Sequence, residues 1–366
     1  MRRKHEIDQL RWRILLLLIP YHAAMAWNAW GEPNYIFFES NRMISSIVVF
    51  FSPFFMPLLF VISGISTRSA LDKRTNRAYL LERVQKLLVP LLSGTLLLMP
   101  VMTYIADTFH SSYHDGFFRH YAIFFTKYTD LTGADGGFSF GQFWFLLYLF
   151  VISFAGTGVI ALVKRYIPKP QKPISLRTVL LLGLPLPLLS ELLSIGGKSL
   201  AEYGYLFLLG YYVFSEETVT DALQQRDRLL CGIGLTAAAL NTVLFLWMET
   251  EHVLLNSLVS DAAEWMMILG LLGFAKGHWN TQGKIADYMQ RRSFLFYQYH
   301  FIWVVLFQFL LSRIAPDNTA VLFLGTVLLS YPATFLCCEI TLRIPVLCLI
   351  TGTKYRGNSR KQKSHP

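Results

Sequence analysis

Two side chains near the start of the chain have the types and the spacing to act on one elongated substrate. Arg11 and His22 lie eleven residues apart, where the polar segment DQLR runs into the apolar segment ILLLLIP. At 100° per residue this interval is three turns plus about 20°, so both side chains share one helix face, roughly 16 Å apart along the axis. A guanidinium at the membrane surface can bind a phosphate group of a substrate. A neutral histidine deeper in the membrane can accept a proton. The spacing predicts a donor-binding residue, Arg11, and a catalytic base, His22.

Each of these residues also has an ordinary interpretation. Arginines at the start of a membrane protein commonly serve as topological anchors, and a single intramembrane histidine can simply bond a neighbouring helix. The shared face favours the functional reading. Asp8, three residues before Arg11, is predicted to support it by orienting the guanidinium. Pro20 is expected to kink the helix before His22 and to free a backbone carbonyl nearby.

Further candidates lie along the chain. Arg83 and Lys86, one helical turn apart, can clamp a phosphate, although a topogenic basic loop has the same composition. Ser63 and Gly64 provide a hydroxyl and a close backbone approach, and ordinary helix packing is the alternative for both. His300 lies with Tyr297 in a span, where a structural hydrogen-bond network is the alternative to catalysis.

Three more acidic residues, Glu191, Glu264 and Glu339, lie in or near spans, and each can partner a histidine or Arg343. The residue types do not distinguish among them.

The hydrophobic composition of the chain indicates that these candidate residues are carried by membrane-spanning helices. Of 366 residues 54% are hydrophobic and only 15% are charged, and the apolar residues form long blocks. We therefore predict an all-α integral membrane protein with about ten transmembrane helices. The expected spans are 14-30, 44-66, 87-106, 142-163, 178-195, 203-215, 229-249, 258-275, 293-313 and 319-341.

The net charge of +10 follows from topology rather than from nucleic-acid binding. With a cytoplasmic N-terminus, 28 of the 33 Lys and Arg residues fall in inner segments. This bias predicts that both termini are cytoplasmic, in the plasma or inner membrane. We expect one transmembrane domain over 1-352 and a basic tail over 353-366 that contacts lipid headgroups. Residues 107-141 are expected to form a long outer loop that covers a binding site.

Several classes of function have no support. The four cysteines show no metal-binding spacing, so neither a metal site nor a disulfide is expected. No Walker A, dinucleotide-binding, HExxH or GxSxG motif occurs, which removes the basis for nucleotide hydrolysis, dehydrogenase and serine-hydrolase activities.

The ordered set of motifs resembles the acyltransferase-3 family of integral membrane O-acyltransferases that modify bacterial surface glycans. The motifs, in order along the chain, are Asp8 to Arg11 with His22, Phe60 to Gly64, Arg83 to Pro90, Trp144 to Leu146, and Ser293 to His300. Lys86 stands where arginine is usual, and Gln142 replaces a histidine often found two residues before Trp144. The lack of an SGNH hydrolase-like domain is similar to stand-alone members.

The resemblance implies transfer of an acetyl or succinyl group from cytosolic acyl-CoA to a hydroxyl of an extracytoplasmic polysaccharide or glycolipid. It implies His22 as the catalytic residue and Arg11, Arg83 and Lys86 as donor-binding residues. It also implies that six further residues support the catalytic and donor-binding residues: Asp8, Ser63, Gly64, Trp144, Tyr297 and His300. Acyl-CoA is then a cosubstrate, and no permanently bound cofactor is expected.

The expected partners are acyl-CoA, the acceptor and membrane lipids, without nucleic acid. One alternative is an exporter or flippase without chemistry, in which the polar residues line a path. A second is a lipid-recruiting partner subunit, which leaves the spacing of Arg11 and His22 unexplained.

Overall fold

The computed structural model describes residues 4-129, 131-166, 173-250 and 252-355. Within these ranges its regular secondary structure is helical apart from one hairpin of two-residue strands. Most of the predicted tail, residues 167-172, and Asp130 of the predicted outer loop lie outside the described residues. The chain divides into two compact units, which are built from alternating segments of the sequence.

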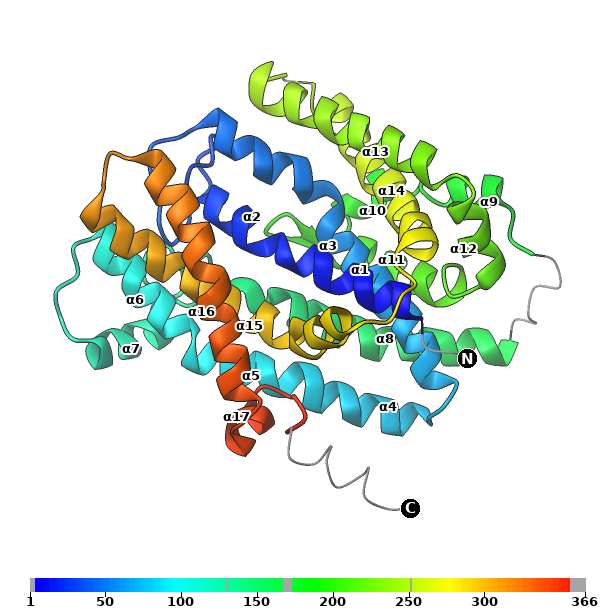
Figure 1. The fold of residues 1–366 in the computed structure, drawn as a ribbon, viewed down its shortest axis with the longest axis horizontal. Coiled ribbons are helices and arrows are strands. Elements are labelled where there is room, and N and C mark those ends of the chain that lie inside the picture. The colour runs from blue at the N-terminus through cyan, green and yellow to red at the C-terminus, as the bar shows by residue number, and fades with distance from the viewer. Residues whose placement is uncertain (1–3, 130, 167–172, 251, 356–366) are drawn as a thin grey trace. The chain divides into compact units, whose positions relative to one another are not determined.

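The first unit comprises residues 1-14, 49-82 and 148-290. Five of its helices, α1, α3, α4, α8 and α15, also have residues in the second unit. The elements are α1 (His5–Leu16), α3 (Arg42–Leu71), α4 (Asn76–Arg83), α8 (Trp144–Tyr166), α9 (Leu176–Leu181), α10 (Leu186–Glu191), β1 (Ser194–Ile195), β2 (Lys198–Ser199), α11 (Leu200–Tyr212), α12 (Glu217–Gln224), α13 (Asp227–Thr242), η3 (Val243–Trp247), α14 (Val253–His278) and the start of α15 (Lys284–Ile314). Helices α13 and α14 pack along each other (Figure 1). Strands β1 and β2 pair antiparallel.

The second unit comprises residues 15-48, 83-147 and 291-366. Besides most of α15, it contains α2 (Leu18–Met25), η1 (Val84–Leu88), α5 (Val89–Leu97), α6 (Met99–His110), α7 (Phe117–Thr126), η2 (Gly141–Phe143), η4 (Val321–Gly325), α16 (Thr326–Thr341) and α17 (Pro345–Ile350). Within this unit α2 packs against α16, and α17 packs against α5.

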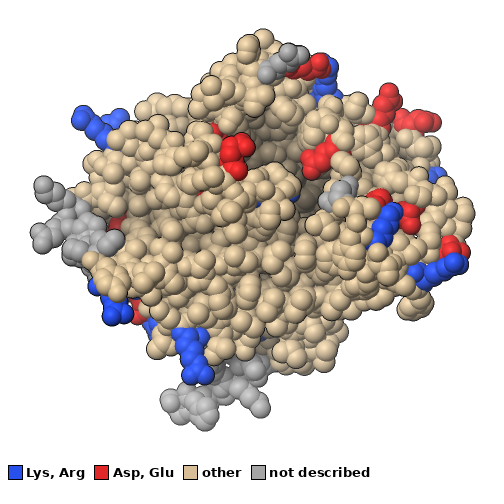
Figure 2. Space-filling view, turned by 180° about the vertical axis from the view of Figure 1, so that it is seen from behind, with Lys and Arg blue, Asp and Glu red and all other residues tan. Residues whose placement is uncertain are grey.

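Seven stretches are long and apolar enough to cross a membrane: 42-71, 76-110, 141-166, 227-247, 253-278, 284-314 and 321-341. Each corresponds to one of the predicted spans, which confirms an all-α, multi-pass membrane architecture. Figure 2 shows a face that is largely free of charged side chains. Leu229, Ile233 and Leu240 of α13 are exposed, as expected of side chains that contact lipid tails.

The count of ten spans is not confirmed. The expected span 178-195 contains two six-residue helices, α9 and α10, because Gly183 and Pro185 lie between them. Pro187 lies in the first turn of α10, where proline is tolerated. The expected span 203-215 corresponds to the 13-residue helix α11. The expected span 14-30 contains the end of α1 and all of α2, which ends at Met25. The orientation of the termini stays a prediction.

Prolines explain two local features of the long helices. Pro20 has no N–H for the carbonyl of Leu16, which instead accepts a hydrogen bond from the Tyr331 hydroxyl at 2.8 Å. The freed carbonyl predicted from Pro20 is therefore present. In α3, Pro53 likewise leaves the carbonyl of Val49 open, and the Asn241 side chain donates to it at 3.5 Å.

Candidate functional site

The second unit brings His22 and His300 together. Their ring centroids lie 5.3 Å apart with the ring planes inclined at 36°. His22 comes from α2 and His300 from α15, and 277 positions of chain lie between them. Phe301 stacks on the His22 ring at 4.0 Å and is itself held by the edge of Tyr35 at 5.3 Å. Apolar packing therefore fixes the imidazole of His22, which remains half-buried.

The tautomer of His300 follows from its hydrogen bonds. Its Nδ1 lies 2.7 Å from the carbonyl oxygen of Tyr297 and 3.2 Å from that of Phe296. A carbonyl only accepts, so Nδ1 carries the proton, and Nε2 of the neutral ring is an acceptor. Nε2 is buried, and no group in the described part of the chain donates to it. A buried acceptor in this state can receive a hydrogen bond from a substrate or from a protonated neighbour.

Tyr297 and Gln142 hold the helix that carries His300. The Tyr297 hydroxyl donates to the backbone carbonyl of Gln142, and the Gln142 side chain donates back to the carbonyl of Gln298 at 3.1 Å. Tyr297 also packs edge-on against Phe145, the residue after Trp144. The segment around Trp144 is therefore bonded to α15. Sequence reasoning left Gln142 without a role, because its task as a brace depends on a contact across 156 residues.

The first unit builds a separate polar group around Arg11. Its Nη1 lies 3.4 Å from Asp8 Oδ1, as the spacing in the sequence predicted, and its Nη2 donates to Ser66 Oγ at 2.7 Å. Gln290 donates its side-chain amide to Asp8 Oδ2. The guanidinium of Arg11 is thus fixed by one contact with α1, through Asp8, and one with α3, through Ser66. Such an arrangement reduces the conformational entropy that ligand binding has to overcome.

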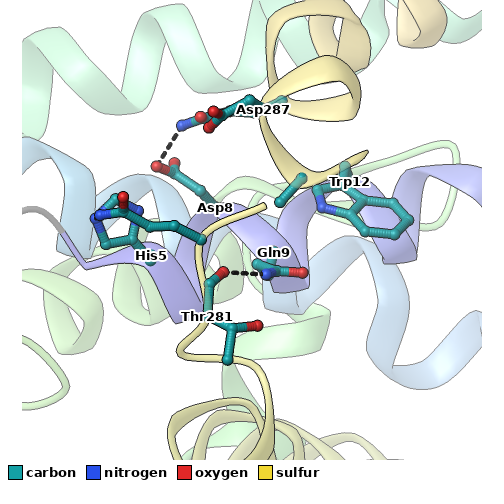
Figure 3. Close-up of a pocket in the computed structure, with 9 residues that line it drawn as sticks. His5, Asp8, Gln9, Trp12, Thr281 and Asp287 are labelled. Atoms are coloured by element: carbon teal, nitrogen blue, oxygen red, sulfur yellow. Dashed lines mark hydrogen bonds between the residues drawn. The ribbon is translucent and has the colours of Figure 1, made fainter. Parts of the chain in front are cut away.

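This group adjoins a small pocket between α1 and the segment 281-290, shown in Figure 3. His5, Gln9 and Trp12 line it from α1, and Asp287 lines it from α15. Gln9 donates to the carbonyl of Thr281 at 2.6 Å, which fastens α1 to this segment.

Arg13 has a structural place beside the pocket. The guanidinium lies 4.3 Å from the ring centroid of Trp12 and 4.3 Å from that of Trp279. These two contacts clamp Arg13 within the first unit.

Ser63 and Gly64 are used in packing. The Ser63 hydroxyl donates to the carbonyl of Leu59 one turn back at 2.7 Å. A Cβ on Gly64 would lie 2.0 Å from the carbonyl oxygen of Phe207, and one on Gly210 would lie 2.2 Å from that of Val61. Helices α3 and α11 therefore cross with their backbones in contact, which is the ordinary alternative for this motif.

Arg83 and Lys86 flank a change in helix type. Arg83 ends α4, and Lys86 lies in η1, a π-helical turn. Bonding from i to i+5 alters the residue spacing per turn, so the one-turn alignment expected for an α-helix does not apply. Gly352 approaches this turn so closely that a Cβ would lie 2.7 Å from the Gln85 carbonyl oxygen. Both basic residues belong to the second unit, whereas Arg11 belongs to the first.

The three undecided glutamates fall into different settings. Glu339 forms an ion pair with Arg292. Glu264 of α14 is buried near Glu202 of α11, which is also buried. Glu191 acts electrostatically on Asp261.

The predicted outer loop contains a helix that the sequence did not reveal. Helix α7 packs against α6, and His120 of α7 is completely buried against Asp107 of α6, with 3.3 Å between Nε2 and Oδ2. Burial lowers the pKa of His120, although the nearby Asp107 carboxylate acts in the opposite direction.

Asp135, later in the same loop, has a hydrogen-bonded carboxylate. Burial acts to raise its pKa, but hydrogen bonds from Thr129, the Gly137 N–H and Lys127 outweigh burial and lower it.

Among residues 4-129, 131-166, 173-250 and 252-355, no three His, Cys, Asp or Glu side chains are grouped so as to hold a metal ion. The chain matches a family model described as an acyltransferase domain over residues 4-338, nearly its whole length. It belongs to the acyltransferase-3 family. No curated protein and no solved structure matches it.

Membership in the acyltransferase-3 family identifies the chain as an acyltransferase, and the apolar helices identify it as a multi-pass membrane protein. The match includes Asp8, Arg11, His22 and His300, so all four residues lie within the family domain.

Proposed function

We propose that this acyltransferase moves an acetyl or succinyl group from cytosolic acyl-CoA to a hydroxyl of an extracytoplasmic polysaccharide or glycolipid. The observation that carries the proposal is the contact between His22 and His300 in a domain of acyltransferase type. O-Acyl transfer needs a group that accepts the hydroxyl proton. The His22 ring is fixed by stacking on Phe301 and is only partly buried, so a proton acceptor is held in place and remains accessible, as that task requires.

In the proposed reaction the acceptor oxygen attacks the thioester carbonyl while its proton passes to His22. The carbon–sulfur bond then breaks, and the proton moves from the imidazolium to the departing thiolate. The products are an O-acyl ester and CoA with a free thiol, and His22 is again neutral. His300 Nε2 accepts a hydrogen bond from protonated His22 and so stabilises the positive charge that develops on that imidazole.

Arg11 is proposed to bind the phosphates of the donor, because Asp8 and Ser66 already orient its guanidinium. Arg83 and Lys86 are proposed to supply further positive charge on the cytosolic side. Trp144 and Tyr297 are proposed to support the histidines, through the bonds between the Gln142 segment and α15. We also propose that the enzyme lies in the plasma or inner membrane with both termini in the cytoplasm, because 28 of its 33 Lys and Arg residues then fall in inner segments.

The test is transfer of a labelled acyl group from acyl-CoA by the purified protein in detergent with a glycan acceptor. His22→Ala is expected to lower kcat at least about 100-fold, the usual scale for loss of a general base. His278→Ala is the matched control, because His278 pairs with Asp227 outside the proposed site. Transfer by His22→Ala at the wild-type rate, with an unchanged melting temperature, would exclude the assignment.

A further inference from the structure

Asp8 uses both of its carboxylate oxygens, and each contacts a different element. Oδ1 faces Arg11 Nη1 at 3.4 Å, and Oδ2 accepts the amide of Gln290. The dashed line at Asp8 in Figure 3 marks this second bond. The path Gln290, Asp8, Arg11, Ser66 is therefore continuous within the first unit, and it joins α15, α1 and α3.

The direction of each bond gives Gln290 a specific task. Its amide donates, so it orients the Asp8 carboxylate without adding charge, and the other oxygen is left toward Arg11. A carboxylate held from both sides restricts the rotamers of the guanidinium. Without Gln290, the Asp8 carboxylate loses one of the two contacts that fix its orientation, and it holds Arg11 less firmly.

We propose that Gln290 is a positioning residue for donor binding: it orients Asp8, which in turn holds the Arg11 guanidinium ready for a phosphate. The proposal rests on the proposed function, in which Arg11 binds the phosphates of acyl-CoA. Helix α15 runs without a break from Lys284 to Ile314, so the same helix carries Gln290 and, ten residues later, His300.

The decisive measurement separates KM from kcat for acyl-CoA. Gln290→Ala is expected to raise KM about fivefold to tenfold and to leave kcat within about twofold, the scale of one ordinary hydrogen bond, because Gln290 acts on the donor only through Asp8 and Arg11. Gln290→Asn, which keeps an amide, is expected to recover part of the loss. Gln290→Glu is expected to raise KM more than alanine does, because it sets a second carboxylate against Asp8.

Gln282→Ala is the matched control. Gln282 lines the same pocket and contacts His5 at 2.7 Å, but it does not belong to the path that leads to Arg11. A wild-type KM is expected for this variant. In an Arg11→Ala background, Gln290→Ala is expected to cause no further rise in KM, because it acts only through Arg11.

The outcomes separate this inference from the proposed function. Calorimetric titration with coenzyme A itself tests donor binding directly. If the wild type binds coenzyme A and transfers acyl groups but Gln290→Ala leaves KM unchanged, the positioning role alone is wrong. The same holds if Gln282→Ala raises KM equally, or if the effect persists without Arg11. If the wild type neither binds coenzyme A nor transfers acyl groups, the proposed function fails and the inference fails with it.

Discussion

The histidine group of the second unit and the arginine group of the first differ in how completely their polar atoms are bonded. His300 has a buried Nε2 without a donor in the described part of the chain, and His22 is held by ring contacts. Arg11 and Asp8, in contrast, have defined hydrogen-bond partners on three helices. The buried acceptor Nε2 of His300 can take part in proton transfer, whereas the fixed guanidinium of Arg11 can bind the phosphates of the donor. The comparison predicts that changes in the first group act on kcat and changes in the second on KM.

The largest effect beyond His22 is expected at His300. His300→Ala removes the acceptor beside His22, and we expect kcat to fall about 100-fold with KM for acyl-CoA within about threefold. Steady-state transfer with labelled acyl-CoA measures both constants. A rise in KM without a fall in kcat would remove the distinction between the two groups.

Arg11 gives the opposite pattern. Arg11→Ala is expected to raise KM for acyl-CoA at least about tenfold, because a charged hydrogen bond to phosphate is lost. Arg11→Lys should restore the charge without the planar fork, so KM is expected to fall between the alanine variant and the wild type. The measurement is the dependence of transfer rate on acyl-CoA concentration. An unchanged KM in both variants would reduce Arg11 to a topological anchor.

How far the sequence predicted these groups depends on the range of each contact. Asp8 and Arg11 are three residues apart, so helical periodicity alone predicted their ion pair. His22 and His300 were each chosen as polar residues in apolar spans, but their contact depends on the packing of α2 against α15. The chain carries no local signal for such packing. Gln290 was missed for the same reason, because its partner Asp8 is 282 residues away.

For the fold, too, the sequence predicted the features set by local properties and missed those set by contacts between distant residues. Long apolar runs predicted ten spans, and seven of them correspond to helices long enough to cross a membrane, since length and hydrophobicity are local properties. The predictions missed features that are set by interruptions and tertiary contacts, such as the separate helices α9 and α10, the π-helical turn η1 and the buried face of α7. Gly352 illustrates the cause, because its close approach to η1 involves residues more than 260 positions earlier.

A smaller effect is expected from the brace beneath His300. Tyr297→Phe removes the hydroxyl that bonds the Gln142 carbonyl, and we expect kcat to fall about threefold to tenfold. Tyr299→Phe is the control, since it removes a hydroxyl from the same helix that contacts Thr341 at 3.0 Å. A stability effect alone would lower the melting temperature of both variants. A fall in kcat confined to Tyr297→Phe would show that the bond between Tyr297 and Gln142 supports the action of His300 in catalysis.

The smallest effect on transfer is expected at His120, which tests whether burial alone makes a histidine catalytic here. His120 is more buried than His22, but it faces Asp107 and holds α7 on α6, so His120→Ala should change kcat less than twofold while lowering the melting temperature.

Burial lowers the pKa of His120 below its ordinary 6.5, so the folded state binds fewer protons than the unfolded state. Its contribution to stability is therefore complete above pH 6.5 and declines as the pH falls from there through the lowered pKa. Melting temperatures of wild type and His120→Ala in detergent across that range should converge toward low pH. Parallel curves would show that His120 does not titrate with folding, and a large loss of kcat would place a third histidine in the reaction.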